Sequence, residues 1–120
     1  MHRAAAFGNK AIISFLSKQD KQLIADWDEN NDTPLHIAAS NSRVKVARLL
    51  INLGAQVDTS NTKGWTPLDC AADVGALEVV KVLVSNDAPI EAADKSQTTP
   101  LHLACKRGHL DVVKYLISEG

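Results

Sequence analysis

The sequence predicts an all-α solenoid of about four helix-turn-helix units that form one domain over residues 1–120. The heptad TPLHIAA at 33–39 returns as TPLDCAA at 66–72 and as TPLHLAC at 99–105. The spacing is 33 residues both times, without insertion or deletion, and a fixed period of this length is typical of repeat architectures. Each heptad begins as helices do, because threonine is a good N-cap and proline at the first helical position has no N–H to leave unpaired.

The polar and apolar residues place two helices in each unit. In the second unit we expect one helix over about 34–41 and another over about 44–53. In the latter, apolar residues recur at spacings that leave Lys45 and Arg48 to solvent, and Gly54 supplies the positive φ that often ends a helix. The first unit lacks the Thr-Pro pair. The expected unit boundaries are 1–27 (partial), 28–60, 61–93 and 94–120 (partial).

The 33-residue period and this heptad together resemble the ankyrin repeat, and the resemblance covers essentially the whole chain. It implies stacked helix pairs from which β-hairpin-like fingers project, so that the fingers and the first helices line a concave face. It also implies a scaffold that binds a partner protein or peptide on that face. Residues 1–6, together with Arg43 and Val44, are similar as well to gankyrin-like members of the family.

Four residues stand where the repeat pattern favours glycine. Asn31 and Gln97 lie at finger turns, where another copy has Gly64. Ser42 lies at the end of a first helix, and Asp87 lies at the end of a second helix. Each replacement is expected to cost up to roughly 1 kcal/mol if its position requires a positive φ.

Composition disfavours several classes of partner. A net charge of −1 gives no general attraction to nucleic acid or to an anionic membrane surface. Apolar runs are only a few residues long, so we expect no membrane insertion, and the N-terminal residues do not resemble a signal peptide. With two cysteines, a disulfide framework is not expected. These features favour a cytoplasmic or nuclear protein.

The sequence contains no pattern that indicates catalysis. It has no glycine-rich phosphate loop or nucleophile motif, and its histidines and cysteines lack zinc-site spacing. The resemblance implies that His36 and His102 hydrogen-bond locally to brace their repeats, with Asp69 in the same place of the middle heptad. Cys70 and Cys105 align with apolar heptad positions, so we expect both thiols to be buried. We therefore expect no enzyme, no metal site and no cofactor.

The resemblance places candidate partner-binding residues on the finger tips and on the exposed ends of the first helices. Trp65 and Phe7 are large aromatics where helix stacking does not require them, and aromatics are frequent in interface hot spots. Trp27 is expected to pack rather than to bind. The first finger is acidic and the fourth unit basic, which favours a partner segment with one basic and one acidic end. The candidates are Phe7, Glu29, Asn30, Asp32, Asn41, Lys63, Trp65, Asp73, Val74, Lys95, Lys106 and Arg107.

The function expected from these observations is a protein–protein interaction scaffold without catalytic activity. The alternative is a targeting or regulatory segment of a larger enzyme, channel or membrane-skeleton adaptor, because both ends of the array look incomplete. A purely structural tether is a third class, and it would have a featureless concave face. Incomplete terminal units would expose apolar surface, so we also expect marginal stability or self-association through the terminal repeats.

Overall fold

Three helix pairs make up the helical part of the structure that can be described. The computed structural model describes residues 10–11 and 29–119, so the first predicted unit, Phe7 and Trp27 lie outside the described residues. Within them there is no strand. The described helices are α3 (Pro34–Ser40), α4 (Val44–Asn52), α5 (Pro67–Val74), α6 (Leu77–Ser85), α7 (Pro100–Arg107) and α8 (Leu110–Glu119). The predicted all-α repeat fold is confirmed, and each helix predicted for the second unit ends one residue earlier than expected.

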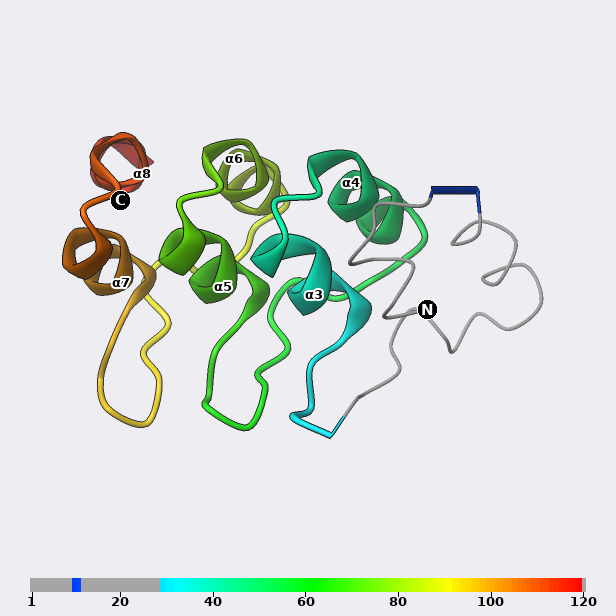
Figure 1. The fold of residues 1–120 in the computed structure, drawn as a ribbon, viewed down its shortest axis with the longest axis horizontal. Coiled ribbons are helices and arrows are strands. Elements are labelled where there is room, and N and C mark those ends of the chain that lie inside the picture. The colour runs from blue at the N-terminus through cyan, green and yellow to red at the C-terminus, as the bar shows by residue number, and fades with distance from the viewer. Residues whose placement is uncertain (1–9, 12–28, 120) are drawn as a thin grey trace.

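The helices are arranged in two rows with the fingers on one side. Figure 1 shows α3, α5 and α7 next to one another as an inner row and α4, α6 and α8 as an outer row. The fingers project from the inner row, away from the outer one (Figure 1). Alanines without exposed surface, among them Ala38 and Ala71, let neighbouring helices approach closely, while fully buried leucines such as Leu50 and Leu83 fill the space between the rows.

Each inner helix starts with the same capping box. The Thr33 side chain accepts a hydrogen bond from the backbone N–H of His36, and the Thr33 N–H donates to the Nδ1 atom of His36. Two of the N–H groups that a helix start leaves without partners are thereby satisfied. The same box forms at Thr66 and at Thr99, three helix starts at the spacing that the sequence predicts.

The four non-glycine residues that occupy predicted glycine positions all have a positive φ. The angles are 59° at Asn31, 57° at Ser42, 66° at Asp87 and 63° at Gln97. They are the only non-glycine residues with positive φ among those that the structure describes. Alignment of the repeats therefore located the strained backbone positions correctly, because the turn geometry is a property of the repeat and the residue placed there is not.

One burial prediction is wrong. Cys70 is buried, but Cys105 is exposed. The equivalent residues Ala39 and Ala72 have no exposed surface, because a further inner helix packs beside each of their helices. No further inner-row helix is described beside α7, so the same side of α7 is open.

Candidate protein-interaction face

The predicted binding residues divide into an exposed group and a half-buried group. We call the fingers, together with the ends of the inner helices that carry these candidates, the inner face. Asp32, Trp65 and Asp73 on this face are half-buried. Phe7 lies outside the described residues. The exposed candidates are Glu29, Asn30, Asn41, Lys63, Val74, Lys95, Lys106 and Arg107.

Hydrogen bonds join the first two described fingers. The side-chain amide of Asn61 donates to Asp32 Oδ1 at 2.8 Å. The backbone N–H and the hydroxyl of Thr62 both donate to the carbonyl oxygen of Asn30, at 2.9 and 2.8 Å. Asp32 and the Asn30 backbone therefore hold the finger row together, which leaves less of their polar surface for a partner than the sequence suggests.

Trp65 connects its own finger to the next one. Its indole Nε1–H donates to Asp94 Oδ2 at 3.0 Å. Its backbone carbonyl accepts a hydrogen bond from His36 Nε2 at 2.9 Å, since His36 Nδ1 is already the acceptor in the capping box. The Lys63 ammonium lies 5.0 Å from the centre of the ring, within the range of a cation–π interaction. The Trp65 side chain thus has a structural role, and its contact with a partner stays a prediction.

Asp94 organises the finger that follows Trp65, and sequence reasoning missed it. Its Oδ1 atom accepts hydrogen bonds from the N–H groups of Ser96 and Thr98, at 2.8 and 2.9 Å. These bonds, the one from Thr98 foremost, hold the pKa of the carboxyl below its ordinary value of 3.8. Asn61, one repeat earlier, accepts from the N–H groups of Lys63 and Trp65 in the same way. An Asn or Asp that recurs at the finger base was the available signal.

A side-chain pair also links the ends of α5 and α7. Arg107 Nε donates to Asp73 Oδ1 at 2.9 Å, and the Asp73 carbonyl accepts from His109 Nε2 at 3.0 Å. Two predicted partner-binding residues therefore bind each other. Val74 beside them is 41% exposed, an unusual exposure for valine. Asn41, at the equivalent end of α3, donates its side-chain amide to the Ile37 carbonyl and caps the helix.

A cavity brings together two of the predicted residues, Trp65 and Lys106. Its volume is about 530 Å³. It lies where the last finger meets α7. Carboxylate, hydroxyl, amide, imidazole and ammonium groups therefore surround one apolar ring. The lining residues are Trp65, Asp94, Ser96, Gln97, Thr98, His102, Leu103 and Lys106.

The described residues show neither a metal-ligand cluster nor an activated thiol at Cys70. No cluster of three or more His, Cys, Asp or Glu side chains that could hold a metal ion occurs among the described residues. Burial raises the pKa of the Cys70 thiol to about 12, so this thiol is a poor nucleophile at neutral pH. None of the described helices has the length and the apolar run needed to cross a membrane.

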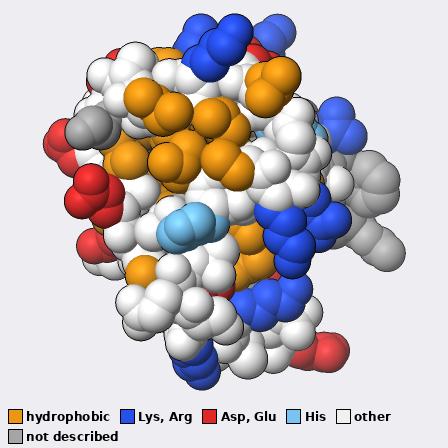
Figure 2. Space-filling view, turned by 90° about the vertical axis from the view of Figure 1, so that its left-hand side faces the viewer, with side chains coloured by type: hydrophobic (Ala, Val, Ile, Leu, Met, Phe, Trp, Pro, Cys, Tyr) orange, Lys and Arg blue, Asp and Glu red, His pale blue; other side chains and the backbone are white. Residues whose placement is uncertain are grey.

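The α7/α8 end of the stack carries an apolar surface. Figure 2, which views this end, shows hydrophobic side chains gathered in one patch with charged side chains around it. Leu110 is 69% exposed and Ile117 is 62% exposed. His102 uses Nδ1 in its capping box, and its Nε2 atom has no described partner of the kind that His36 finds in the next finger. We call this surface the end face.

The architecture of the described residues is that of a helical repeat protein. The model of the family described as "Ankyrin repeats (3 copies)" matches residues 1–94 and 58–120. The chain belongs to the ankyrin repeat family. Ankyrin repeats are generally protein-interaction modules, and the family is generally non-catalytic.

Curated relatives include proteins of very different size. The chain is 41% identical over 64 residues to protein phosphatase 1 regulatory subunit 27 of Mus musculus, which covers 53% of this chain and 41% of the relative. It is 42% identical over 55 residues to alpha-latrotoxin-Lt1a of Latrodectus tredecimguttatus, 46% of this chain and 4% of the toxin. It is 37% identical over 68 residues to human transient receptor potential cation channel subfamily A member 1, 55% of this chain and 6% of the channel. The matched region is less than half the length of each of these relatives.

Proposed function

We propose that this protein binds a segment of a partner protein on the inner face, with the cavity between Trp65 and Lys106 at the centre of the contact. The cavity is the observation that carries the proposal. It combines an aromatic ring with an exposed ammonium group, and buried aromatic side chains near the centre of an interface often dominate binding energy. Polar groups of Asp94, Ser96 and Thr98 around it would fix the orientation of a bound side chain.

The fingers that border the cavity are held in place before any partner binds. Asp32 and Asn61 tie two fingers together, and Trp65 and Asp94 tie the next pair. A face that is ordered beforehand binds with a smaller loss of conformational entropy. This supports recognition of an extended segment that lies across several fingers.

Charges on the inner face favour a particular orientation of the partner segment. Lys63, Lys95 and Lys106 are exposed toward the α7 side, whereas Glu29 is exposed at the first described finger. A partner segment with acidic residues near α7 and basic residues near Glu29 would match this arrangement, chiefly by steering association and setting the orientation. We place the protein in the cytoplasm or the nucleus as part of this proposal.

A second candidate function is that of a regulatory or targeting segment within a larger protein. The chain corresponds to only part of a relative named as a regulatory subunit and to a small part of a cation channel. In that case the inner face would bind a segment of the same polypeptide or of its assembly. The binding chemistry would be unchanged, and only the source of the segment would differ.

Capture of partners with charge-reversed variants tests the proposal. The test variant is Lys95→Glu with Lys106→Glu, and the matched control is Lys45→Glu with Lys114→Glu on the outer helices, where both lysines are also exposed. Trp65 is left intact because its removal would also break the bond to Asp94. We expect a protein captured by the unaltered chain and by the control to be lost by the test variant. Equal retention by the test and control variants would contradict binding on the inner face.

A further inference from the structure

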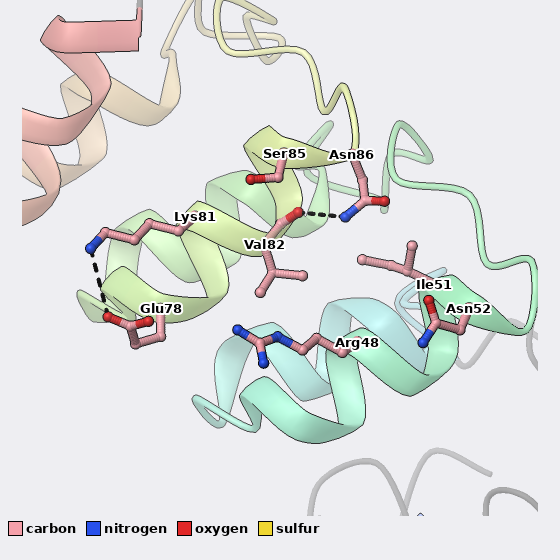
Figure 3. A pocket seen from close by; sticks show the side chains of 8 residues that line it. All are labelled: Arg48, Ile51, Asn52, Glu78, Lys81, Val82, Ser85 and Asn86. Atoms are coloured by element: carbon pink, nitrogen blue, oxygen red, sulfur yellow. Dashed lines mark hydrogen bonds and ion pairs between the residues drawn. The ribbon is translucent and has the colours of Figure 1, made fainter.

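A groove runs between two outer helices, on the other side of the molecule from the fingers. Its volume is about 370 Å³. Figure 3 shows Arg48 reaching from α4 toward α6, with Ile51 and Val82 pointing into the space between the helices. Val82 is buried and Ile51 half-buried, so the floor is apolar. The remaining lining residues are polar or charged: Asn52, Glu78, Lys81, Ser85 and Asn86.

Arg48 has no partner in this groove. The acidic residue in the lining, Glu78, pairs with Lys81 of its own helix at 3.8 Å, and both side chains are well exposed. Within the part of the chain that the structure describes, Arg48 has neither an ion pair nor a contact with an aromatic ring. Asn86 in the same lining donates its side-chain amide N–H to the Val82 carbonyl and not to a charged group. The guanidinium therefore keeps both its flat face and its N–H donors available.

The next repeat shows what can occupy such a place. A shift of 33 residues takes Arg48 to Lys81 and Val82 to Tyr115. Lys81 Nζ lies 5.9 Å from the centre of the Tyr115 ring, a cation–π contact between α6 and α8. The Tyr115 ring is half-buried and packs against the core. Between α4 and α6 the cation is present, but valine leaves the place of the ring empty.

We propose that the groove between α4 and α6 binds an aromatic side chain of a partner protein, with an acidic residue next to it in the partner's sequence. The ring would lie on Ile51 and Val82 beneath the guanidinium of Arg48, as Tyr115 lies beside Lys81. A guanidinium can stack on a ring and at the same time donate edge N–H groups to a carboxylate. The adjacent acidic residue therefore satisfies the donors that the ring leaves free.

This surface is separate from the inner face. The groove is formed by outer-row helices, whereas the fingers project from the opposite side of the inner row (Figure 1). No residue lines both this groove and the cavity beside Trp65. The inference therefore stands or falls independently of the proposed function, and one chain could hold two partner segments at once.

Titration with short peptides, followed by NMR of the labelled protein, tests the inference. The probe is the capped tripeptide Glu-Tyr-Glu, and its controls are Glu-Ala-Glu and Gln-Tyr-Gln. We expect saturable shifts of the Arg48 side-chain N–H and of the Val82 and Ile51 methyl groups with the probe. Removal of the ring or of both carboxylates should weaken binding by about tenfold each, the effect of one such interaction. Shifts confined to the inner face, or equal binding of all three peptides, would overturn the inference.

Two variants identify the groove, and a third serves as a matched control. Val82→Tyr places the ring of the next repeat into the groove, and Arg48→Ala removes the exposed cation with little effect on the core. Both should weaken binding of the probe about tenfold or more, while Lys114→Ala, an exposed outer-helix cation outside the groove, should leave it unchanged. Circular dichroism checks that each variant is folded. If Val82→Tyr does not fold, the result for Arg48→Ala decides the test. Unchanged binding by Arg48→Ala would overturn the inference.

Discussion

Asp69 shows how one residue changes the link between repeats. In the first described heptad, His36 uses Nδ1 for the capping box and Nε2 for the carbonyl of Trp65 in the next finger. Asp69 completes its capping box through Oδ2 but is too short to reach the next finger. Its Oδ1 atom is buried and has no described hydrogen-bond partner. A buried polar atom of this kind destabilises the fold, because its hydration is lost without replacement.

Replacement of Asp69 by histidine should therefore stabilise the protein. The new Nε2–H could donate to the carbonyl of Thr98, which is equivalent to the carbonyl of Trp65. We expect Asp69→His to raise the free energy of unfolding at neutral pH by about 1–3 kcal/mol, the range for a new hydrogen bond plus relief of an unsatisfied charged group. Urea denaturation measures this, with His36→Asp as the reciprocal change that should destabilise. A loss of stability in Asp69→His would contradict the structural equivalence of the two sites.

Stability should also depend on pH through Asp69. Burial raises the pKa of Asp69 from 3.8 to about 6, against the lowering effect of its hydrogen bonds from Thr66. Since the pKa is higher in the folded state, the contribution of this group is fully present below pH 3.8 and is lost as the pH rises through about 6. The loss is about 3 kcal/mol at most for a shift of about two pH units.

A comparison of the unaltered chain with Asp69→Asn isolates the effect of Asp69, because the two proteins share all other titrating groups. Denaturation should show the unaltered chain losing stability relative to Asp69→Asn as the pH rises through about 6. Asp94, whose pKa is lowered, acts in the opposite sense and only in more acidic solution. A stability difference between the two proteins that does not change with pH would contradict the shift.

Two glycines with the same backbone angle should respond differently to alanine. Gly75 has φ 76° and Gly108 has φ 77°, so either substitution strains the backbone by about 1 kcal/mol. A Cβ atom on Gly75 would lie 2.5 Å from His109 Nδ1, whereas one on Gly108 would meet nothing within 4 Å. The His109 ring would have to move and lose its bond to the Asp73 carbonyl.

We therefore expect Gly75→Ala to cost about 2–3 kcal/mol and Gly108→Ala about 1 kcal/mol, the difference being the displaced hydrogen bond and packing. Thermal and urea unfolding of the two variants measure the costs. In a protein that already carries His109→Ala, adding Gly75→Ala should lower the free energy of unfolding only by the backbone strain of about 1 kcal/mol. Equal costs for the two single variants would show that His109 adjusts freely.

At the scale of elements, the sequence predicts what the repeat imposes. Helix starts follow from Thr-Pro pairs and helix ends from glycine positions, and the structure confirms both to within a residue. Ties between neighbouring elements, such as Trp65 to Asp94 and Arg107 to Asp73, were not predicted. Such a tie depends on the length of the side chain and on which hydrogen-bonding group the neighbouring repeat places within its reach. The repeat period alone specifies neither of these. Cys105 was misjudged for the same reason, since burial at a repeat position requires a neighbour.

The finger turn at Gln97 should be improved by glycine. Gln97 has φ 63° and is exposed, so its side chain contributes little to offset the strained backbone. We expect Gln97→Gly to stabilise the protein by about 0.5–1 kcal/mol, less the added flexibility of the unfolded chain. Ser96→Gly next to it, where φ is not positive, is the matched control and should be neutral or destabilising. Denaturation that shows no gain for Gln97→Gly over Ser96→Gly would contradict the strain.

At the scale of the whole molecule, the candidate surfaces differ in how far the sequence could predict them. The inner face follows from family resemblance, and eight of its predicted residues are indeed exposed. The groove between α4 and α6 could not be predicted, because it depends on a small side chain at Val82 and on Arg48 having no ion pair or ring contact among the described residues. Exposed apolar surface at a terminal unit was expected from the sequence, although its residues were not named. The reason is that a helix pair without a further neighbour leaves apolar residues uncovered.

Self-association of the 120-residue chain through the end face is the last prediction, and it rests on the exposed apolar residues of α8. Leu110 and Ile117 are more than 60% exposed. A symmetric contact between two copies would bury this pair of residues on each copy, four side chains in all. Burying four such side chains gives about 8 kcal/mol, against at least about 4 kcal/mol of lost translational and rotational freedom. The net value of about 4 kcal/mol corresponds to a dissociation constant of about 1 mM, so dimers should form only in concentrated solution.

Sedimentation velocity over a concentration series extending to about 1 mM should therefore show a reversible rise in average mass. Leu110→Lys with Ile117→Lys should abolish the rise, because each charge would have to be desolvated in the contact. The matched control, Lys45→Glu with Lys114→Glu, alters outer-helix charges without altering the two apolar residues, and it should still associate. Mass that stays monomeric throughout, or association that survives the two lysines, would show that the end face does not hold a second copy.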